Sequence, residues 1–259
     1  MENFLPSEEL RERLEMLYER FAVPQFIEND PISIPHRYSK KEDIEISGFL
    51  SSTIAWGNRR AILSSAREMM QRMDDAPYDF VLSASKNEIK SLENFVYRTF
   101  SGADFQDFII CLGNLCRKWG SLGELFESLY ASNGAIDKTL AAFREEFFQT
   151  EHSSHCEKHV SNILKGAACK RLNMYLRWMV RSDEHNIDFG LWKTIPKSEL
   201  FLPLDVHTSR VGRKFSLLKR KQADWKATVE ITESLRLYDR EDPVRFDFAL
   251  FGAGVNHEE

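Results

Sequence analysis

The sequence predicts an all-α fold, a single compact unit of many helices over residues 1–259 that allows two lobes. Apolar residues recur at three- and four-residue spacing along most of the chain, which is typical of amphipathic helices with one buried face. The alternation expected of a half-buried strand does not recur, and we find no internal repeat or low-complexity linker. A chain of 259 residues that is 42% hydrophobic and 29% charged is long enough to bury a substantial core.

The first two helices are predicted from their start signals. Ser7 is placed to cap the first helix, because Leu14 and Leu17 follow it at helical spacing. A loop with three Pro residues comes next, and Asp43 then marks the start of a second helix that carries Phe49 on its apolar side.

Gly57 predicts a corner between the second helix and the next one. This corner would expose Trp56 and Asn58 and place two Arg residues at the start of the following helix. Trp56 is also compatible with a place in the core, and the sequence slightly favours that alternative.

The middle of the chain predicts a scaffold of helices with a Phe-rich core. The periodic segments are Phe105–Trp119, Leu122–Tyr130 and Ile136–Phe148, with breaks at Gly102, Gly120 and Asn133. The residues Tyr97–Phe100 read as an incidental turn. This part of the sequence carries no signal for chemistry.

The segment HSSHCEKH raises the question of a metal site. We expect it to be helical and to lead into the next turn with His152, His155, Cys156 and His159 on one face. A single straight helix normally supplies only two ligands to a tetrahedral ion, so that a full site would need ligands from elsewhere. The sequence therefore predicts neither a metal nor a cofactor, and a solvent-facing polar helix face is the simpler interpretation.

The stretch from Gly166 to Asp205 carries the candidate chemistry. Three small residues, Gly166–Ala168, allow a sharp turn, and the periodic helix after them has Lys170 in its first turn. A cation there opposes the helix dipole by roughly 0.3–1 kcal/mol, and a nucleophilic lysine needs the neutral amine. Each residue also has a plainer interpretation, since Lys170 is placed like a solvated side chain and Asp205 like a helix N-cap.

Three further elements follow in the C-terminal third. Trp192 is expected to anchor an inserted corner against the core. The residues 226–237 predict another amphipathic helix, and a last helix should begin with Pro243 in its first turn.

Two families resemble this chain. A tight turn of small residues, a helix with Lys in its first turn and an Asp opening a later helix resemble the helix-hairpin-helix DNA glycosylases, nearest their archaeal 8-oxoguanine branch. The segments GAACKRLNMYLRWMVR, PLDVHTSRVGRK and DPVRFDFALFGAG look like a conserved bacterial family of unknown function (DUF2400-like), over most of the chain. The glycosylase resemblance implies a helix-hairpin-helix core at about residues 156–215 and a DNA-binding cleft between two lobes.

The glycosylase resemblance also implies residue roles. Lys170 matches the lysine that attacks the sugar C1′ and forms a Schiff base, and Asp205 matches the carboxylate that assists it. Gly166 and Ala168 match the hairpin glycines whose amides face a phosphate; an Ala would be strained if its φ had to be positive. The implied base pocket contains Trp56, Asn58 and Asp247, although Asp247 is equally compatible with the outer face of its helix.

Charge and cysteine content bear on partners and location. The net charge of −5 hides a basic segment, 157–226, with 15 Lys and Arg against 7 Asp and Glu. We therefore expect DNA as partner, with RNA as the alternative and no membrane, and leave the oligomeric state open. The residues expected to position phosphates are Arg171, Arg177, Arg210 and Lys214. The acidic N-terminus, the absence of a long apolar run and the lack of a CxxC pair predict a cytoplasmic protein without disulfides.

The glycosylase resemblance, together with the basic segment, implies a DNA base-excision glycosylase that acts on a damaged purine such as 8-oxoguanine, with β-lyase activity through the imine. The alternative is a non-catalytic helix-hairpin-helix protein that binds DNA or RNA. A third interpretation is a helical scaffold without a nucleic-acid role.

Overall fold

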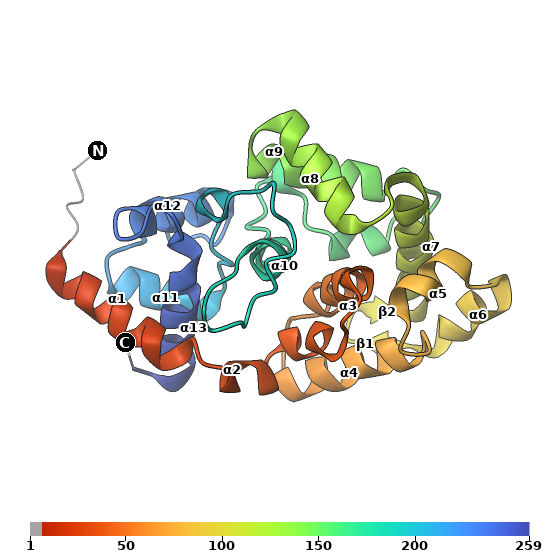
Figure 1. Ribbon diagram of the computed structural model, residues 1–259, viewed down its shortest axis with the longest axis horizontal. Helices are drawn as coiled ribbons and strands as arrows, with labels where there is room; N and C mark the ends of the chain where they lie inside the picture. Colours follow the sequence, from red (N-terminus) through yellow and green to blue (C-terminus); the bar gives the residue numbers. More distant parts are fainter. Residues whose placement is uncertain (1–6, 259) are drawn as a thin grey trace. The chain divides into compact units, whose positions relative to one another are not determined.

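Helices make up most of residues 7–258, the part of the chain that the computed structural model describes (Figure 1). The expected all-α fold is confirmed at this level. The only sheet in the described part is a hairpin of two-residue strands, β1 (Val96–Tyr97) and β2 (Phe100–Ser101), paired antiparallel. It surrounds the turn expected at Tyr97–Phe100.

The chain divides into two compact units. Unit 1 consists of Met1–Phe26, Ile163–Gly190 and Ile195–Glu259. Unit 2 consists of Ile27–Asn162 and Leu191–Thr194. The short helix α2 (Gln25–Glu28) spans the boundary between them.

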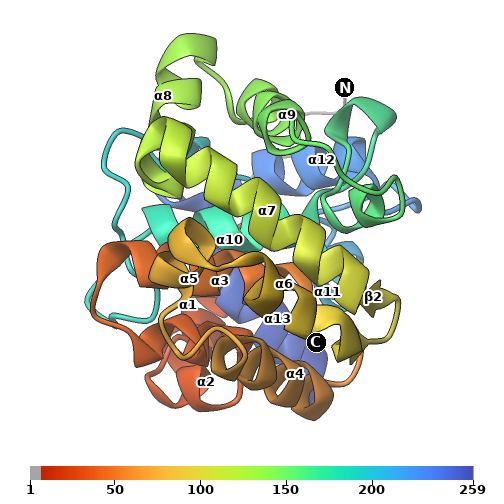
Figure 2. The same cartoon turned by 90° about the vertical axis from the view of Figure 1, so that its right-hand side faces the viewer.

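Unit 2 is organised around its longest helix. Its α-helices are α3 (Lys41–Thr53), α4 (Arg59–Gln71), α5 (Pro77–Ser83), α6 (Lys86–Ser91), α7 (Gly102–Trp119), α8 (Leu122–Asn133) and α9 (Ile136–Phe147). Figure 2 shows α7 running between α8 and α9 on one side and α5 and α6 on the other, and these helices contact α7. The breaks predicted at Gly102, Gly120 and Asn133 lie at the ends of these helices.

Aromatic rings fill the core of unit 2, as the Phe content predicts. Phe126 stacks on Phe143 with ring centres 4.3 Å apart, and Trp192 stacks on Phe126 at 4.9 Å. Trp192 also donates its indole N–H to Glu45 Oε1 at 2.8 Å. The expected anchoring of the 183–203 corner by Trp192 is therefore confirmed.

Unit 1 joins the two ends of the chain. Its α-helices are α1 (Glu8–Phe21), α10 (Lys170–Val180), α11 (Val206–Lys214), α12 (Trp225–Arg236) and α13 (Phe246–Asn256). Helix α1, capped by Ser7 as predicted, lies against α13 (Figure 1). Helix α13 also packs on α11, where a Cβ on Gly254 would come within 2.9 Å of His207 Cβ. Gly254 thus permits the close approach of these two helices.

Two predicted helix starts differ from the structure. The segment before the Gly166–Ala168 turn is not an α-helix. Between Phe147 and Lys170, the helical elements are only the 3-10 turns Cys156–His159 and Ile163–Lys165. Near the C-terminus, Pro243 opens the 3-10 turn Pro243–Arg245, and α13 follows it. In the first case, loop contacts made by the His side chains outweigh the weak helical pattern.

Candidate functional site

Lys170 is the first residue of α10, as predicted. The residue before it, Cys169, has a φ of 52°, a left-handed conformation that turns the chain sharply into the helix. The Cys169 side chain is buried and its thiol donates to the carbonyl of Ala167. This turn places Lys170 at the mouth of α10, where the helix dipole is positive.

Lys170 and Asp205 meet in space. Lys170 Nζ lies 3.8 Å from Asp205 Oδ2. The other oxygen, Oδ1, accepts the backbone N–H groups of His207 at 2.8 Å and Thr208 at 3.0 Å, and thereby caps α11. One oxygen of the carboxylate therefore caps a helix, as predicted, and the other faces the lysine.

The pair is open to solvent on one side. The Lys170 side chain is 30% exposed and that of Asp205 is 16% exposed. Both side chains are therefore only partly buried.

The small-residue turn is held by hydrogen bonds to α12. Gly166 has a φ of 78° with open space where a Cβ would lie, and its carbonyl accepts the Trp225 N–H at 2.9 Å. Its own N–H donates to the Ile163 carbonyl at 2.8 Å, which corrects the expectation that this amide faces a phosphate.

Ala168 does not have the positive φ that would strain an Ala; the residues of this turn with positive φ are Gly166 and Cys169. The Ala168 carbonyl accepts hydrogen bonds from Asn173 and Thr228, each at 3.3 Å. The Ala at this position is thus compatible with the turn.

Asp247 lies inside unit 1 and not on an outer helix face. It is 6% exposed, and one of its oxygens accepts a hydrogen bond from Arg177. Burial raises the pKa of Asp247 to about 7 against the lowering effect of Arg177, and Asp205 and Lys170 also act on it electrostatically. Asp247 is therefore a second carboxylate close enough to the Lys170–Asp205 pair to sense its charge.

Arg177 is part of this interior and does not reach solvent. It is 2% exposed and pairs with Asp188 as well as with Asp247. Because an Arg buried between two carboxylates cannot meet a phosphate, the phosphate contact expected for Arg177 is wrong. The residue supports Asp247 instead.

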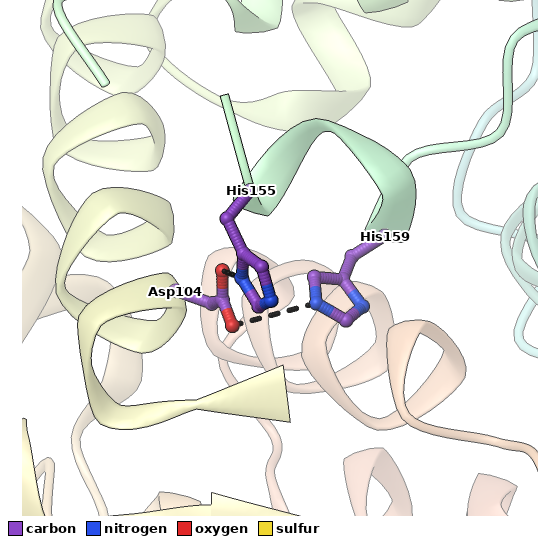
Figure 3. A group of neighbouring side chains, drawn as sticks. All are labelled: Asp104, His155 and His159. Atoms are coloured by element: carbon purple, nitrogen blue, oxygen red, sulfur yellow. Dashed lines mark hydrogen bonds and ion pairs between the residues drawn. The ribbon is translucent and has the colours of Figure 1, made fainter. Parts of the chain in front are cut away.

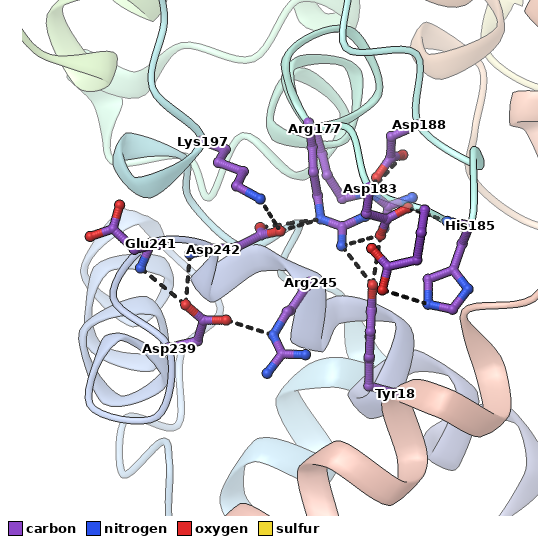
Figure 4. Close-up of polar contacts among 12 residues, drawn as sticks. Tyr18, Arg177, Asp183, His185, Asp188, Lys197, Asp239, Glu241, Asp242 and Arg245 are labelled. Atoms are coloured by element: carbon purple, nitrogen blue, oxygen red, sulfur yellow. Dashed lines mark hydrogen bonds and ion pairs between the residues drawn. The ribbon is translucent and has the colours of Figure 1, made fainter.

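The buried network continues along α10 to Arg181. Its guanidinium contacts Asp188 at 3.1 Å and Asp242 at 3.0 Å, and it is completely buried. In Figure 4, Lys197 also reaches Asp242, and the Tyr18 hydroxyl donates to Asp183. Some of the basic side chains of residues 157–226 are therefore buried in ion pairs inside unit 1, and fewer of them lie on the surface than the sequence count indicates.

The other predicted phosphate-binding residues remain at or near the surface. Arg210 and Lys214 on α11 are exposed, and Arg210 donates to the Gly254 carbonyl at 2.5 Å. Arg171 is half-buried, and burial lowers its pKa to about 10. These three residues stay candidates for phosphate contact.

Trp56 and Asn58 belong to unit 2. The Asn58 side chain caps α4 by accepting the Ala61 N–H at 3.2 Å, and Gly57 forms the predicted corner with a φ of 100°. Trp56 is half-buried, and its ring stacks on His159 with centres 5.9 Å apart. Both residues thus have a local structural role within unit 2.

A cluster that sequence reasoning missed lies in the same unit. Figure 3 shows Asp104 facing His155 and His159. The ligand atoms of the three residues lie within 4.8 Å of one another. His155 and His159 belong to the HSSHCEKH segment, whereas Asp104, 51 positions before His155, carries no signal in the sequence.

Comparison with known proteins identifies one family. Residues 30–256 match the model of a family described as "Protein of unknown function (DUF2400)". No curated protein and no solved structure matches the chain. Within residues 7–258, none of the helices has the length and apolar character that crossing a bilayer requires.

Proposed function

The chain belongs to the family described as protein of unknown function (DUF2400), and from its own site we propose that it is a DNA glycosylase that removes a damaged purine such as 8-oxoguanine through a lysine imine. The observation that carries the proposal is the contact of Lys170 with Asp205 at 3.8 Å, with each residue at the start of a helix. A nucleophilic amine beside a carboxylate is the pairing that covalent displacement at a sugar carbon needs.

The proposed reaction begins with an extruded nucleotide, whose extrusion costs a few kcal/mol and least for a damaged or mispaired base. The neutral amine of Lys170 attacks C1′, the C1′–N bond to the base breaks, and the base leaves with the electron pair and takes a proton from water. After the C–N bond has formed, the Lys170 nitrogen carries a positive charge, and Asp205 Oδ2 accepts one of its protons. The C1′–O4′ bond then opens to give the imine, and O4′ takes up a proton.

The imine also accounts for strand cleavage. Loss of a C2′ proton allows the C3′–O bond to break, and the 3′ phosphate leaves with that electron pair. Asp247, whose pKa is raised to about 7 by burial, is suited to hold a proton near this site. Phosphates would be held by the exposed Arg210 and Lys214, which carry no sequence information.

Borohydride trapping tests the proposal. The protein is incubated with duplexes that contain 8-oxoguanine or an abasic site, reduced, and examined for a covalent adduct. We expect an adduct with the wild type and none with Lys170→Gln, which should still bind DNA. Lys165→Gln is the matched control, because Lys165 is an exposed lysine of the same turn and should leave the adduct unchanged.

Two outcomes would contradict the proposed reaction of Lys170. An adduct that persists in Lys170→Gln would place the chemistry elsewhere. No adduct together with salt-dependent duplex binding would favour the alternative, a non-catalytic DNA- or RNA-binding module. That alternative is supported by the capping role of Asp205, which explains this residue without any reaction.

A further inference from the structure

The cluster of Asp104, His155 and His159 brings three potential metal ligands together from two elements of unit 2. Asp104 lies in the first turn of α7, whereas His155 precedes the 3-10 turn Cys156–His159 and His159 ends it. His155 Nδ1 lies 2.7 Å from Asp104 Oδ1, and His159 Nε2 lies 3.5 Å from Asp104 Oδ2 (Figure 3). On a tetrahedral zinc ion with bonds of about 2.0–2.1 Å, neighbouring ligand atoms lie about 3.3 Å apart. Small side-chain shifts would therefore suffice to enclose an ion.

Asp104 is fixed as a carboxylate. Its Oδ2 accepts the Ser101 N–H at 2.7 Å and the Ser101 hydroxyl at 2.8 Å, as part of the capping box of α7. Such outer hydrogen bonds orient the ligand of a metal in the same way.

The two imidazoles differ in access. His159 is buried and its orientation is set by rings, since it packs edge-on to Phe100 at 4.8 Å and stacks with Trp56 at 5.9 Å. The His155 side chain is 53% exposed, which leaves a path to solvent. Asp104 and His159 are thus held in place by buried contacts, whereas His155 faces water.

We propose that Asp104, His155 and His159 form a binding site for a divalent transition-metal ion of the zinc class, with its remaining position open to water. Two imidazole nitrogens and one carboxylate oxygen are the donors of many zinc sites with an open position, whereas calcium and magnesium prefer oxygen alone.

The surroundings include one competitor for this site. Lys158 Nζ lies 2.6 Å from His155 Nε2, on the side of the ring away from Asp104. When Nδ1 binds a metal, the proton of a neutral imidazole lies on Nε2, so Lys158 has to turn away. Asp107, one turn further along α7, adds negative charge near the cluster. The buried Cys156 thiol faces Asp107, and burial raises its pKa.

The other residues of HSSHCEKH are not ligands in this arrangement. His152 packs on Phe148 with ring centres 4.6 Å apart and faces Glu157. It provides a matched control, because it is a His of the same segment that lies outside the cluster.

Titration of the chelator-treated full chain with Zn²⁺ by calorimetry tests the site. We expect one ion per chain and binding at least about 100-fold weaker in His155→Ala, because one of three ligands is lost. His152→Ala and Lys170→Ala should bind like the wild type, the second because the metal site does not depend on the proposed lysine chemistry. Lys158→Gln should bind more tightly, since it removes the competing ammonium.

The choice of His155 keeps the test clear of folding defects, because this side chain is the exposed member of the cluster. Asp104→Asn is the second variant, with circular dichroism to establish that it folds. The absence of saturable binding in the wild type, or equal affinity of His155→Ala and the wild type, would overturn the site. The cluster would then be a hydrogen-bonded clamp that joins the turn to α7.

Discussion

Lys170 Nζ lies 3.8 Å from Oδ2 of Asp205, while Oδ1 of the same carboxylate caps α11. The contact joins the starting points of two helices of unit 1 that are separated by 35 positions in the sequence. Since the two oxygens have different partners, substitutions can separate the structural role of Asp205 from its proposed chemical role.

Asp205→Asn should fold like the wild type but react poorly. Asn is as good an N-cap as Asp, whereas Asp205→Ala should lose about 1 kcal/mol of stability with the cap. The loss of the proton acceptor should slow imine formation by about 10²–10⁴-fold in both variants. Urea unfolding and the rate of borohydride trapping measure the two effects, and an Asp205→Asn variant that traps at the wild-type rate would remove Asp205 from the mechanism.

Gly166→Ala should destabilise the turn before α10 more than Ala168→Gly does. Gly166 has a φ of 78° with open space around it, so an Ala there costs only its backbone strain, roughly 1–2 kcal/mol. Ala168 has no positive φ, and a Gly there should lower stability by about 0.4–1 kcal/mol without raising the affinity for duplex DNA. Chemical denaturation and fluorescence anisotropy check the pair; tighter DNA binding by Ala168→Gly would show that the turn is strained after all.

Asp247 should make the stability of the protein depend on pH. Its pKa in the folded protein, about 7, lies above the value of about 4 in an unfolded chain. The folded state therefore holds the proton more tightly, and this contribution is complete below about pH 4 and lost as the pH rises to about 7. Relative to Asp247→Asn, the wild type should lose at most about 1.4 kcal/mol per pH unit across this window.

Unfolding by urea at several pH values measures the difference between the two proteins. Asp137→Asn is the control for the removal of one exposed carboxylate. A difference for Asp247→Asn that varies with pH no more than that of the control would mean that Arg177 keeps Asp247 ionised throughout.

Glu45 should be a strong contributor to the stability of unit 2. Its two oxygens accept the indole N–H of Trp192 at 2.8 Å and the backbone N–H of Gly123 at 3.1 Å, both buried. Glu45→Ala leaves two buried donors unsatisfied and should cost about 2–4 kcal/mol, whereas Glu45→Gln keeps one acceptor and should cost less.

The matched control for Glu45 is Glu127→Ala, which removes an exposed hydrogen bond to the Thr194 N–H in the same corner and should cost under about 1 kcal/mol. Urea unfolding followed by Trp fluorescence compares the three variants. Equal costs for Glu45→Ala and Glu127→Ala would show that the buried contacts of Glu45 are not important for stability.

Local signals in the sequence were sufficient for most helices and their starts. Ser7 and Asp205 cap helices where the sequence predicts it, and Lys170 opens α10. These features depend on residues a few positions apart, so that the spacing of apolar residues and the hydrogen-bonding capacity of a single side chain determine them. The helix predicted for HSSHCEKH, before the Gly166–Ala168 turn, does not form, because its helical pattern is weak and its His side chains have partners elsewhere in the chain.

Local sequence patterns were enough to predict a helical protein with a lysine in the first turn of one helix and an aspartate capping another. The pairing of charged residues depends on how the helices pack: Asp205 meets Lys170, Arg177 meets Asp247, and Asp104 meets His155 and His159. The residues that determine a helix lie within a few turns of one another in the sequence, whereas the partner of a buried polar group comes from whichever element packs against it. Arg177 illustrates the difference, because the same residue is a candidate phosphate ligand in the sequence and a buried partner of two carboxylates in the fold.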